Sequence, residues 1–123
     1  MLKQGVFRES RSRFASPIVL AKKKDGSLCF CVDYRRLNAH TIIQPYPIPH
    51  LEESLEAVTE KRYFMSLDME SGYYQTCVRV CDIHKTAFIT RDGLYEWTRM
   101  PFGLVNAPFT FQKTMNGMFC DIL

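Results

Sequence analysis

Two Asp-Gly pairs, each lying between apolar or alternating segments, restrict most strongly how this chain folds. Asp-Gly is a preferred pair for the two-residue turn of a β-hairpin, because that turn needs residues that tolerate positive φ. The pair at 25–26 predicts a hairpin with strands at about 18–22 and 28–32. The pair at 92–93 predicts a second hairpin within residues 85–100.

The second strand of the first hairpin has two different faces. Successive side chains of a strand point to opposite sides, so Cys29 and Cys31 are expected on one face. The other face carries Leu28, Phe30 and Val32.

The middle of the chain predicts an extended connection, a helix and a strand. Three prolines within residues 44–49 exclude a helix there. Residues 50–58 predict a short amphipathic helix. Its apolar positions are Leu51, Leu55 and Val58. Residues 62–68, "RYFMSLD", predict a buried strand that ends at Asp68.

The C-terminal part predicts a second helix. This helix begins at about Ala107 and tolerates Pro108 in its first turn. Its apolar side consists of Phe111, Met115 and Met118. The coarse order of elements is hairpin, helix, strand, short helix, hairpin, helix, which indicates an α+β fold with antiparallel pairing.

Length and composition set broad limits. A chain of 123 residues with a 46% apolar share is one domain or part of one, with a packed core. No apolar run approaches the roughly 20 residues of a membrane span, and no signal-peptide pattern opens the chain. We therefore expect an intracellular protein without a membrane segment.

Basic residues are concentrated at the start of the chain. Residues 1–36 contain nine lysines or arginines and three acidic residues, whereas the remainder contains seven and ten. This asymmetry suits a polyanionic partner approached from one side. From charge alone, a solvated basic face is the better explanation.

The five cysteines do not predict a disulfide framework, because their number is odd and nothing signals secretion. The segment Cys77-x3-Cys81-x2-His84 superficially resembles a metal-binding cluster. It lacks the paired C-x2-C spacing of zinc ribbons and fingers, so ordinary thiols are favoured and no zinc site is predicted.

Asp68 is the residue whose chemistry most needs an explanation. It ends an apolar approach just before Ser71 and Gly72, and a buried carboxylate is costly without a partner. Such a residue is either a helix N-cap or a magnesium ligand at the rim of a sheet, and taken alone the N-cap is favoured. Two-metal chemistry needs at least two convergent carboxylates. The neighbouring Glu70 is expected in the first turn of a helix, so it is not interpreted as the second carboxylate.

Other candidate contacts are basic or aromatic. The lysines at 22–24 can reach phosphates from the hairpin turn, although they are equally ordinary on an exposed hairpin. Tyr73, Tyr74 and Phe102 offer flat rings to bases or sugars. The sequence has no G-x4-G-K-[ST] phosphate loop and no G-x-S-x-G nucleophile elbow.

The motifs, taken in order, resemble one family. The chain reads "ASPIVLAKKKDGSLCFCVDYRRLNAHTI", "YPIPHLEE", "YFMSLDMESGYYQ", "KTAFIT" and "YEWTRMPFGLVNAPFTFQKTMN". These blocks resemble the reverse transcriptase of gypsy-type LTR retrotransposons over essentially the whole chain. The resemblance implies a right-hand polymerase fold, with the fingers at about 1–60 and the upper palm at about 61–123.

The resemblance also assigns roles to residues. Asp68 matches the first of three catalytic carboxylates, which binds both Mg²⁺ ions. The residues that match nucleotide contacts are Lys23 at the γ-phosphate, the backbone cradle of Ser71 and Gly72, Tyr73 as the steric gate against a ribose 2′-hydroxyl, and Phe102 at the 3′-hydroxyl pocket. The residues that match template contacts are Asp33, Tyr34 and Arg35, and Gln112 matches a supporting palm residue.

The chain departs from the family pattern at three places. Cys29 occupies the position of a basic residue that clamps the triphosphate, and a thiol cannot make the bidentate contact of an arginine. "SGYYQT" replaces the family's "SGYHQI". The family's Tyr-x-Asp-Asp hairpin is expected beyond residue 123, so the two-metal site is expected to be incomplete within this chain.

The resemblance predicts a fragment of an RNA-directed DNA polymerase, inactive alone. The intact enzyme would use Mg²⁺, an RNA or DNA template–primer and dNTPs, in the cytoplasm or nucleus. Two alternatives stay open: a non-catalytic nucleic-acid-binding module and an inert retroelement remnant.

Overall fold

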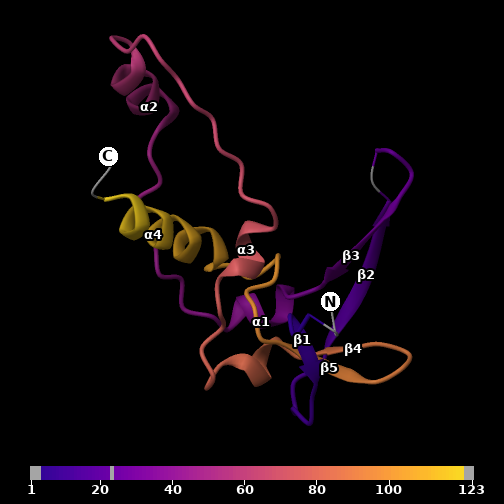
Figure 1. Ribbon diagram of the computed structural model, residues 1–123. Helices are drawn as coiled ribbons and strands as arrows, with labels where there is room; N and C mark the ends of the chain where they lie inside the picture. Colours follow the sequence, from indigo (N-terminus) through magenta and orange to yellow (C-terminus); the bar gives the residue numbers. More distant parts are fainter. Residues whose placement is uncertain (1–3, 23, 121–123) are drawn as a thin grey trace.

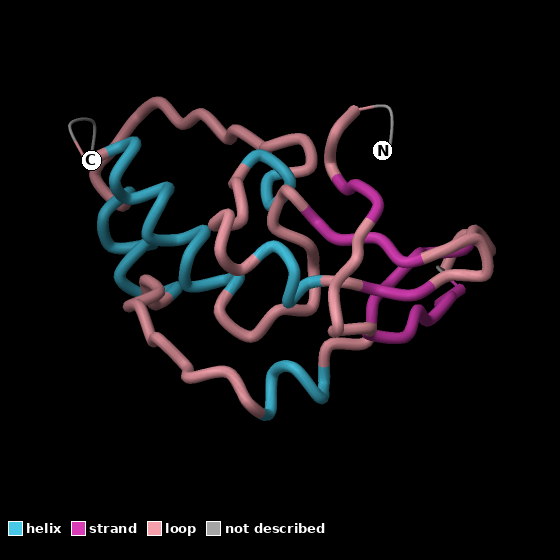
Figure 2. Tube along the Cα trace, turned by 90° about the horizontal axis from the view of Figure 1, so that it is seen from below, coloured by secondary structure: helices cyan, strands magenta, loops and turns pink. Residues whose placement is uncertain are grey.

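The computed structural model describes residues 4–22 and 24–120 (Figure 1). The strands gather at one side of the molecule and the longest helix lies at the other (Figures 1 and 2). The elements in chain order are β1 (Phe7–Glu9), β2 (Ser16–Lys22), β3 (Leu28–Val32), α1 (Arg35–Ala39), α2 (Leu51–Val58), α3 (Gly72–Gln75), the 3₁₀ helix η1 (Ile83–Thr86), β4 (Phe88–Ile89), β5 (Leu94–Trp97) and α4 (Ala107–Phe119). This composition confirms the α+β class.

The five strands form one mixed sheet in the order β1-β5-β4-β2-β3. All neighbours are antiparallel except β2 and β4, which run parallel with Ser16 opposite Phe88. The expectation of antiparallel pairing alone was therefore wrong. A turn specifies the pairing inside its own hairpin, but the connection between two hairpins decides how they dock, and that connection carries no local signal.

Both predicted hairpins are confirmed. In the first, Lys22 lies opposite Leu28, and the Asp25 carboxylate accepts hydrogen bonds from the amide and hydroxyl of Ser27 at 2.9 and 2.6 Å. Gly26 has a φ of 82°, the left-handed region that the Asp-Gly signal anticipates. The second hairpin pairs β4 with β5 but is shorter than predicted, because η1 occupies its expected start.

A group of aromatic rings forms the core on one side of the sheet. Tyr34, Phe88 and Trp97 are each at most 2% exposed. The ring of Phe7, from edge strand β1, packs edge-on against Phe88 and Trp97 with centroids 5.7 and 5.4 Å apart. The Tyr34 hydroxyl donates a 2.7 Å hydrogen bond to the Thr86 carbonyl, so the buried polar group is satisfied.

The two predicted longer helices are present. Pro108 lies in the first turn of α4, where its missing N–H costs no intrahelical bond. α2 lies away from the sheet, between two extended segments (Figure 1), and its apolar residues Leu55 and Val58 are 57% and 40% exposed. Among the residues that the structure describes, no helix has the length and apolar character needed to cross a bilayer.

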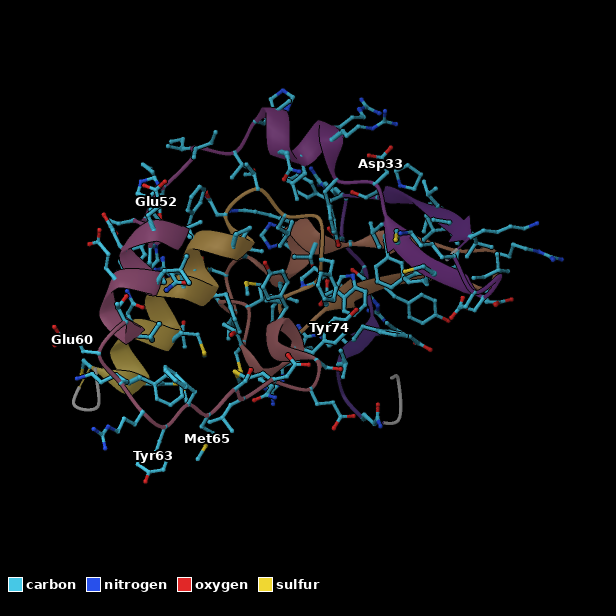
Figure 3. The ribbon with its side chains drawn as sticks, turned by 90° about the horizontal axis from the view of Figure 1, so that it is seen from above. Asp33, Glu52, Glu60, Tyr63, Met65 and Tyr74 are labelled. Carbon is cyan, nitrogen blue, oxygen red and sulfur yellow. The ribbon has the colours of Figure 1, made fainter. Side chains whose placement is uncertain are left out.

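The predicted buried strand at 62–68 was wrong. Residues 63–69 are extended but belong to no strand. Their apolar side chains are exposed, with values of 93% for Tyr63, 67% for Phe64, 83% for Met65 and 80% for Leu67. Figure 3 shows Tyr63 and Met65 pointing away from the ribbon. An apolar pattern predicts burial only where a partner strand lies alongside, and no described strand does so here.

Candidate functional site

A tight turn introduces α3 at the centre of the molecule. Ser71 is its N-cap residue and has a φ of 53° and a ψ of 43°, a left-handed conformation that is unusual for a residue with a side chain. The Ser71 carbonyl accepts a 2.9 Å bond from the Tyr74 amide, and the Gln75 side chain donates a 2.8 Å bond to the Glu70 carbonyl. These two hydrogen bonds hold the turn in place.

This turn corrects two expectations. The N-cap of α3 is Ser71, so the interpretation of Asp68 as an N-cap was wrong. Glu70 had been expected in the first turn of a helix, but it precedes α3. The helix starts later than the sequence suggested because the left-handed Ser71 delays the first helical residue to Gly72.

Gly72 lies where α3 meets α4. A Cβ on Gly72 would be 2.9 Å from Cζ and 3.1 Å from Cε2 of Phe111. Real Cβ atoms rarely approach other atoms so closely, so the Phe111 ring would have to shift to admit a side chain at this position. Phe111, predicted to lie on the apolar side of its helix, is the residue that presses against this turn.

Tyr73 brings two distant segments into contact. Its ring lies 4.8 Å from the ring of Phe102 at an interplanar angle of 36°, and 5.2 Å from the ring of Phe111 at 64°. Aromatic pairs in such geometries contribute about 0.5–1.5 kcal/mol beyond their burial. Phe102 nevertheless stays 57% exposed, so part of this residue remains accessible to solvent. The structure therefore assembles three of the predicted nucleotide contacts, Gly72, Tyr73 and Phe102.

The loop that carries Phe102 is anchored by a residue that the sequence analysis missed. Asn38, in α1, donates a 2.8 Å bond to the Gly103 carbonyl and accepts a 3.0 Å bond from the Val105 amide. Gly103 also lies against the Tyr34 ring, since a Cβ there would be 3.5 Å from Tyr34 Cδ2. No local pattern marks Asn38, because its partners lie more than sixty residues away.

The three predicted template contacts do not share one environment. Asp33 accepts bonds from the Arg35 guanidinium at 2.6 Å and from the Arg35 amide at 3.0 Å, and these bonds lower the pKa of Asp33 to about 2. The Arg35 side chain is 89% exposed. Tyr34 lies in the core, so its side chain supports this surface from below and does not face a ligand. Figure 3 places Asp33 where β3 passes into α1.

One further predicted residue, Gln112, lies in α4. The Gln112 side chain donates a 2.9 Å hydrogen bond to Asn116. The Asn116 amide in turn donates a 3.2 Å bond to the Tyr46 hydroxyl, and this second bond connects α4 to the extended connection. Lys23 lies outside the described residues. Its neighbours Lys22 and Lys24 are exposed beside the hairpin turn.

Asp68 is exposed on the extended segment before the turn. Magnesium takes six ligands in octahedral geometry, usually one or two carboxylates with water and phosphate oxygens. Within residues 4–22 and 24–120, no group of three or more His, Cys, Asp or Glu side chains is placed to hold a metal ion. In the described part of the chain, Asp68 is therefore not joined by two other potential ligand side chains in one cluster.

The comparisons with known proteins agree with this arrangement. The family model described as "Reverse transcriptase (RNA-dependent DNA polymerase)" matches residues 21–123. The chain belongs to the reverse transcriptase family. It is 44% identical over 128 residues to the Retrovirus-related Pol polyprotein from transposon 297 of Drosophila melanogaster, a match that covers 100% of this chain and 12% of that protein. It is 38% identical over 115 residues to the Transposon Tf2-3 polyprotein of Schizosaccharomyces pombe, covering 94% of this chain and 9% of that protein.

Solved structures of reverse transcriptases share the fold. The prototype foamy virus protease–reverse transcriptase superposes with a TM-score of 0.85 at 27% identity, over 99% of this chain and 16% of that one. A foamy viral protease–reverse transcriptase in complex with an RNA/DNA hybrid superposes with a TM-score of 0.79 at 25% identity, over 98% of this chain and 16% of that one. The expected fingers and palm architecture is confirmed, and this reverse transcriptase segment spans a small part of each relative.

Proposed function

We propose that this reverse transcriptase segment supplies the fingers, at about 1–60, and the upper palm, at about 61–123, of an RNA-directed DNA polymerase. The reaction would add dNTPs to a primer 3′-hydroxyl on an RNA or DNA template. The observation that carries the proposal is the contact between Tyr73 and Phe102 at 4.8 Å. It joins two motifs, 29 residues apart, that the family resemblance had assigned to the same nucleotide.

Within this proposal, Tyr73 is the wall that excludes a ribose 2′-hydroxyl. Its ring is held between Phe102 and Phe111, so it cannot swing away to admit a bulkier sugar. Phe102 would contact the sugar with its exposed face. Asp68 would supply one carboxylate ligand to Mg²⁺, and Ser71 and Gly72 would offer backbone amides to the triphosphate.

The template side would be formed by Asp33 and Arg35. The guanidinium is oriented by the carboxylate yet remains exposed, which suits a contact to a phosphate. The exposed Lys22 and Lys24 add positive charge on the same hairpin. The foamy virus relatives, one with double-stranded DNA and one with an RNA/DNA hybrid, support a nucleic-acid partner for this chain.

The test is primer extension by the longer polymerase that contains this segment. On an RNA template with a DNA primer, Asp68→Asn should abolish dNTP addition, whereas Asp92→Asn, at the tip of the second hairpin, should leave it unchanged. Tyr73→Ala should retain dNTP addition and raise incorporation of ribonucleotides. Normal extension by the Asp68→Asn enzyme, or unaltered sugar selectivity of the Tyr73→Ala enzyme, would contradict the assignment.

A second candidate function is nucleic-acid binding by this chain without turnover, favoured by the exposed Lys22, Lys24 and Arg35. Each phosphate contact should contribute about 0.9 to the slope of log affinity against log salt. Fluorescence anisotropy of a labelled RNA/DNA hybrid with the 123-residue chain measures this slope. Lys22→Ala and Arg35→Ala should each reduce it, and Lys113→Ala, on α4, should not. An inert remnant would bind no hybrid at any salt concentration.

A further inference from the structure

The proposed polymerase function uses no contact from the cysteine pair on β3. Cys29 and Cys31 share one face of the strand, as the alternation of the sequence predicted, and their sulfur atoms lie 3.6 Å apart. We propose that these two thiols form a dithiol site that binds a thiophilic centre requiring two sulfur ligands, such as the trivalent arsenic of an aromatic arsenical.

The spacing of the sulfur atoms suits a single bridging centre. A disulfide bond is about 2.05 Å long, so these are two separate thiols. Two thiolates on one tetrahedral centre, with bonds of about 2.3 Å, are about 3.8 Å apart, and the narrower angles at pyramidal trivalent arsenic bring them somewhat closer. The observed 3.6 Å lies close to that separation, so both side chains can bind one atom with little movement.

The number of ligands decides the class of centre. A structural zinc ion needs four protein ligands. The described residues contain no group of three or more His, Cys, Asp or Glu side chains placed around one ion. A centre satisfied by two sulfur atoms therefore fits the pair better than a zinc ion does.

The pair is accessible from an apolar pocket. β3 is an edge strand of the sheet, Cys31 is exposed and Cys29 is partly exposed. The pocket has a volume of about 650 Å³, within the ordinary range for small-molecule sites. The residues that line it are Phe7, Leu28, Cys29, Phe30, Cys31, Tyr74 and Phe102. This lining favours an aromatic substituent on the bound centre.

The pKa values of Cys31 and Tyr74 are both shifted at this pair. The Cys31 thiol donates a hydrogen bond to the Cys29 sulfur, and this bond, with burial and the neighbouring thiol, raises the pKa of Cys31. The pKa of the Tyr74 hydroxyl is raised by burial and then by both thiols, which indicates that it lies near the two sulfurs. Both groups therefore lie close enough to a bound centre to contact it.

The binding step balances without an oxidant. The hydrated form of phenylarsine oxide carries two hydroxyl groups on arsenic. Two As–O bonds and two S–H bonds break, two As–S bonds form, and the protons leave with the hydroxyl groups as two water molecules. Arsenic stays trivalent throughout.

The test is intact-protein mass spectrometry of the full chain after treatment with phenylarsine oxide. The natural chain and the variant Cys77→Ser/Cys81→Ser/Cys120→Ser should both form a one-to-one adduct. That adduct should survive excess 2-mercaptoethanol and be removed by 2,3-dimercaptopropanol. Cys29→Ser and Cys31→Ser should each lose the monothiol-resistant adduct, with the fluorescence of Trp97 confirming that they remain folded.

Two results would overturn the proposal. One is a resistant adduct that persists without Cys29 or Cys31. The other is the absence of an adduct from a natural chain whose Trp97 emission shows it to be folded. A comparison with methylarsine oxide tests the pocket separately: the phenyl compound should bind more tightly, and equal binding would refute the contribution of the apolar lining.

Discussion

Replacing Gly72 by alanine tests whether the contact between α3 and α4 holds the candidate nucleotide site together. The added Cβ would lie 2.9 Å from Cζ of Phe111, well inside the optimal carbon–carbon separation of about 3.5–4.0 Å. Overpacking of this kind costs about 1–3 kcal/mol. Phe111 is half-buried and can yield at the end of its ring, which favours the lower part of that range.

Helix propensity acts in the opposite direction. Alanine is favoured over glycine by up to about 1 kcal/mol inside a helix, and by less at the first residue of a short one. Subtracting this gain from the steric cost leaves an expected net loss of about 1 kcal/mol in the free energy of unfolding. The contact, and not the propensity, therefore decides the sign.

Urea unfolding followed by tryptophan fluorescence measures this loss. Trp97 is the single tryptophan of the chain and stacks on Tyr74 with ring centroids 5.4 Å apart, so its emission reports the core beside α3. Gly72→Ala should lower the urea midpoint with an unchanged slope. The matched background is Phe111→Leu, which removes the end of the ring that the new Cβ would meet.

The two substitutions together form a double-mutant cycle. In the Phe111→Leu background, Gly72→Ala should cost much less than it does alone, since the clash is gone. The reasoning is refuted if Gly72→Ala stabilises the natural chain, or if its cost is the same in both backgrounds.

Three further outcomes are expected. Tyr34→Phe removes the hydroxyl that donates to the Thr86 carbonyl, and should cost about 1–2 kcal/mol in urea unfolding; an unchanged midpoint would show that the bond contributes nothing. Burial alone would raise the pKa of Glu96, but hydrogen bonds from a serine and an arginine lower it below 4.5. The ionised Glu96 should therefore contribute fully to the free energy of unfolding above pH 4.5, and this contribution should be lost as the pH falls through the lower pKa of the folded state. Glu96→Gln should flatten that part of the plot of unfolding free energy against pH. Phe64→Ser and Leu67→Ser, on exposed side chains, should each change stability by less than about 0.5 kcal/mol, and a loss above about 1 kcal/mol would show that the segment is buried in solution.

The elements that the sequence predicted well have their causes nearby in the chain. The Asp25-Gly26 and Asp92-Gly93 turns bring together strands that lie within a few residues of each other. α4 begins where its proline and apolar spacing place it. The order of motifs was informative for the same reason, because each block is a short local pattern, and together they identified the family.

The candidate site was predictable in its residues but not in its construction. The resemblance named Gly72, Tyr73 and Phe102, yet nothing in the sequence indicated that Phe111 holds the first two or that Asn38 anchors the loop of the third. Tyr34 was named as a template contact, although the structure places its ring in the core.

The sequence by itself determined the hairpins, the position of α4, the shared face of Cys29 and Cys31, and the membership of the family. These depend on turn chemistry and on side-chain periodicity, which act within a few residues. Tertiary structure alone decided the parallel docking of β2 on β4 and the meeting of Tyr73 with Phe102. It also decided the exposure of residues 63–68, whose apolar pattern had predicted burial. Contacts between distant segments depend on how whole elements pack, and local periodicity carries no information about which partner an apolar face will find.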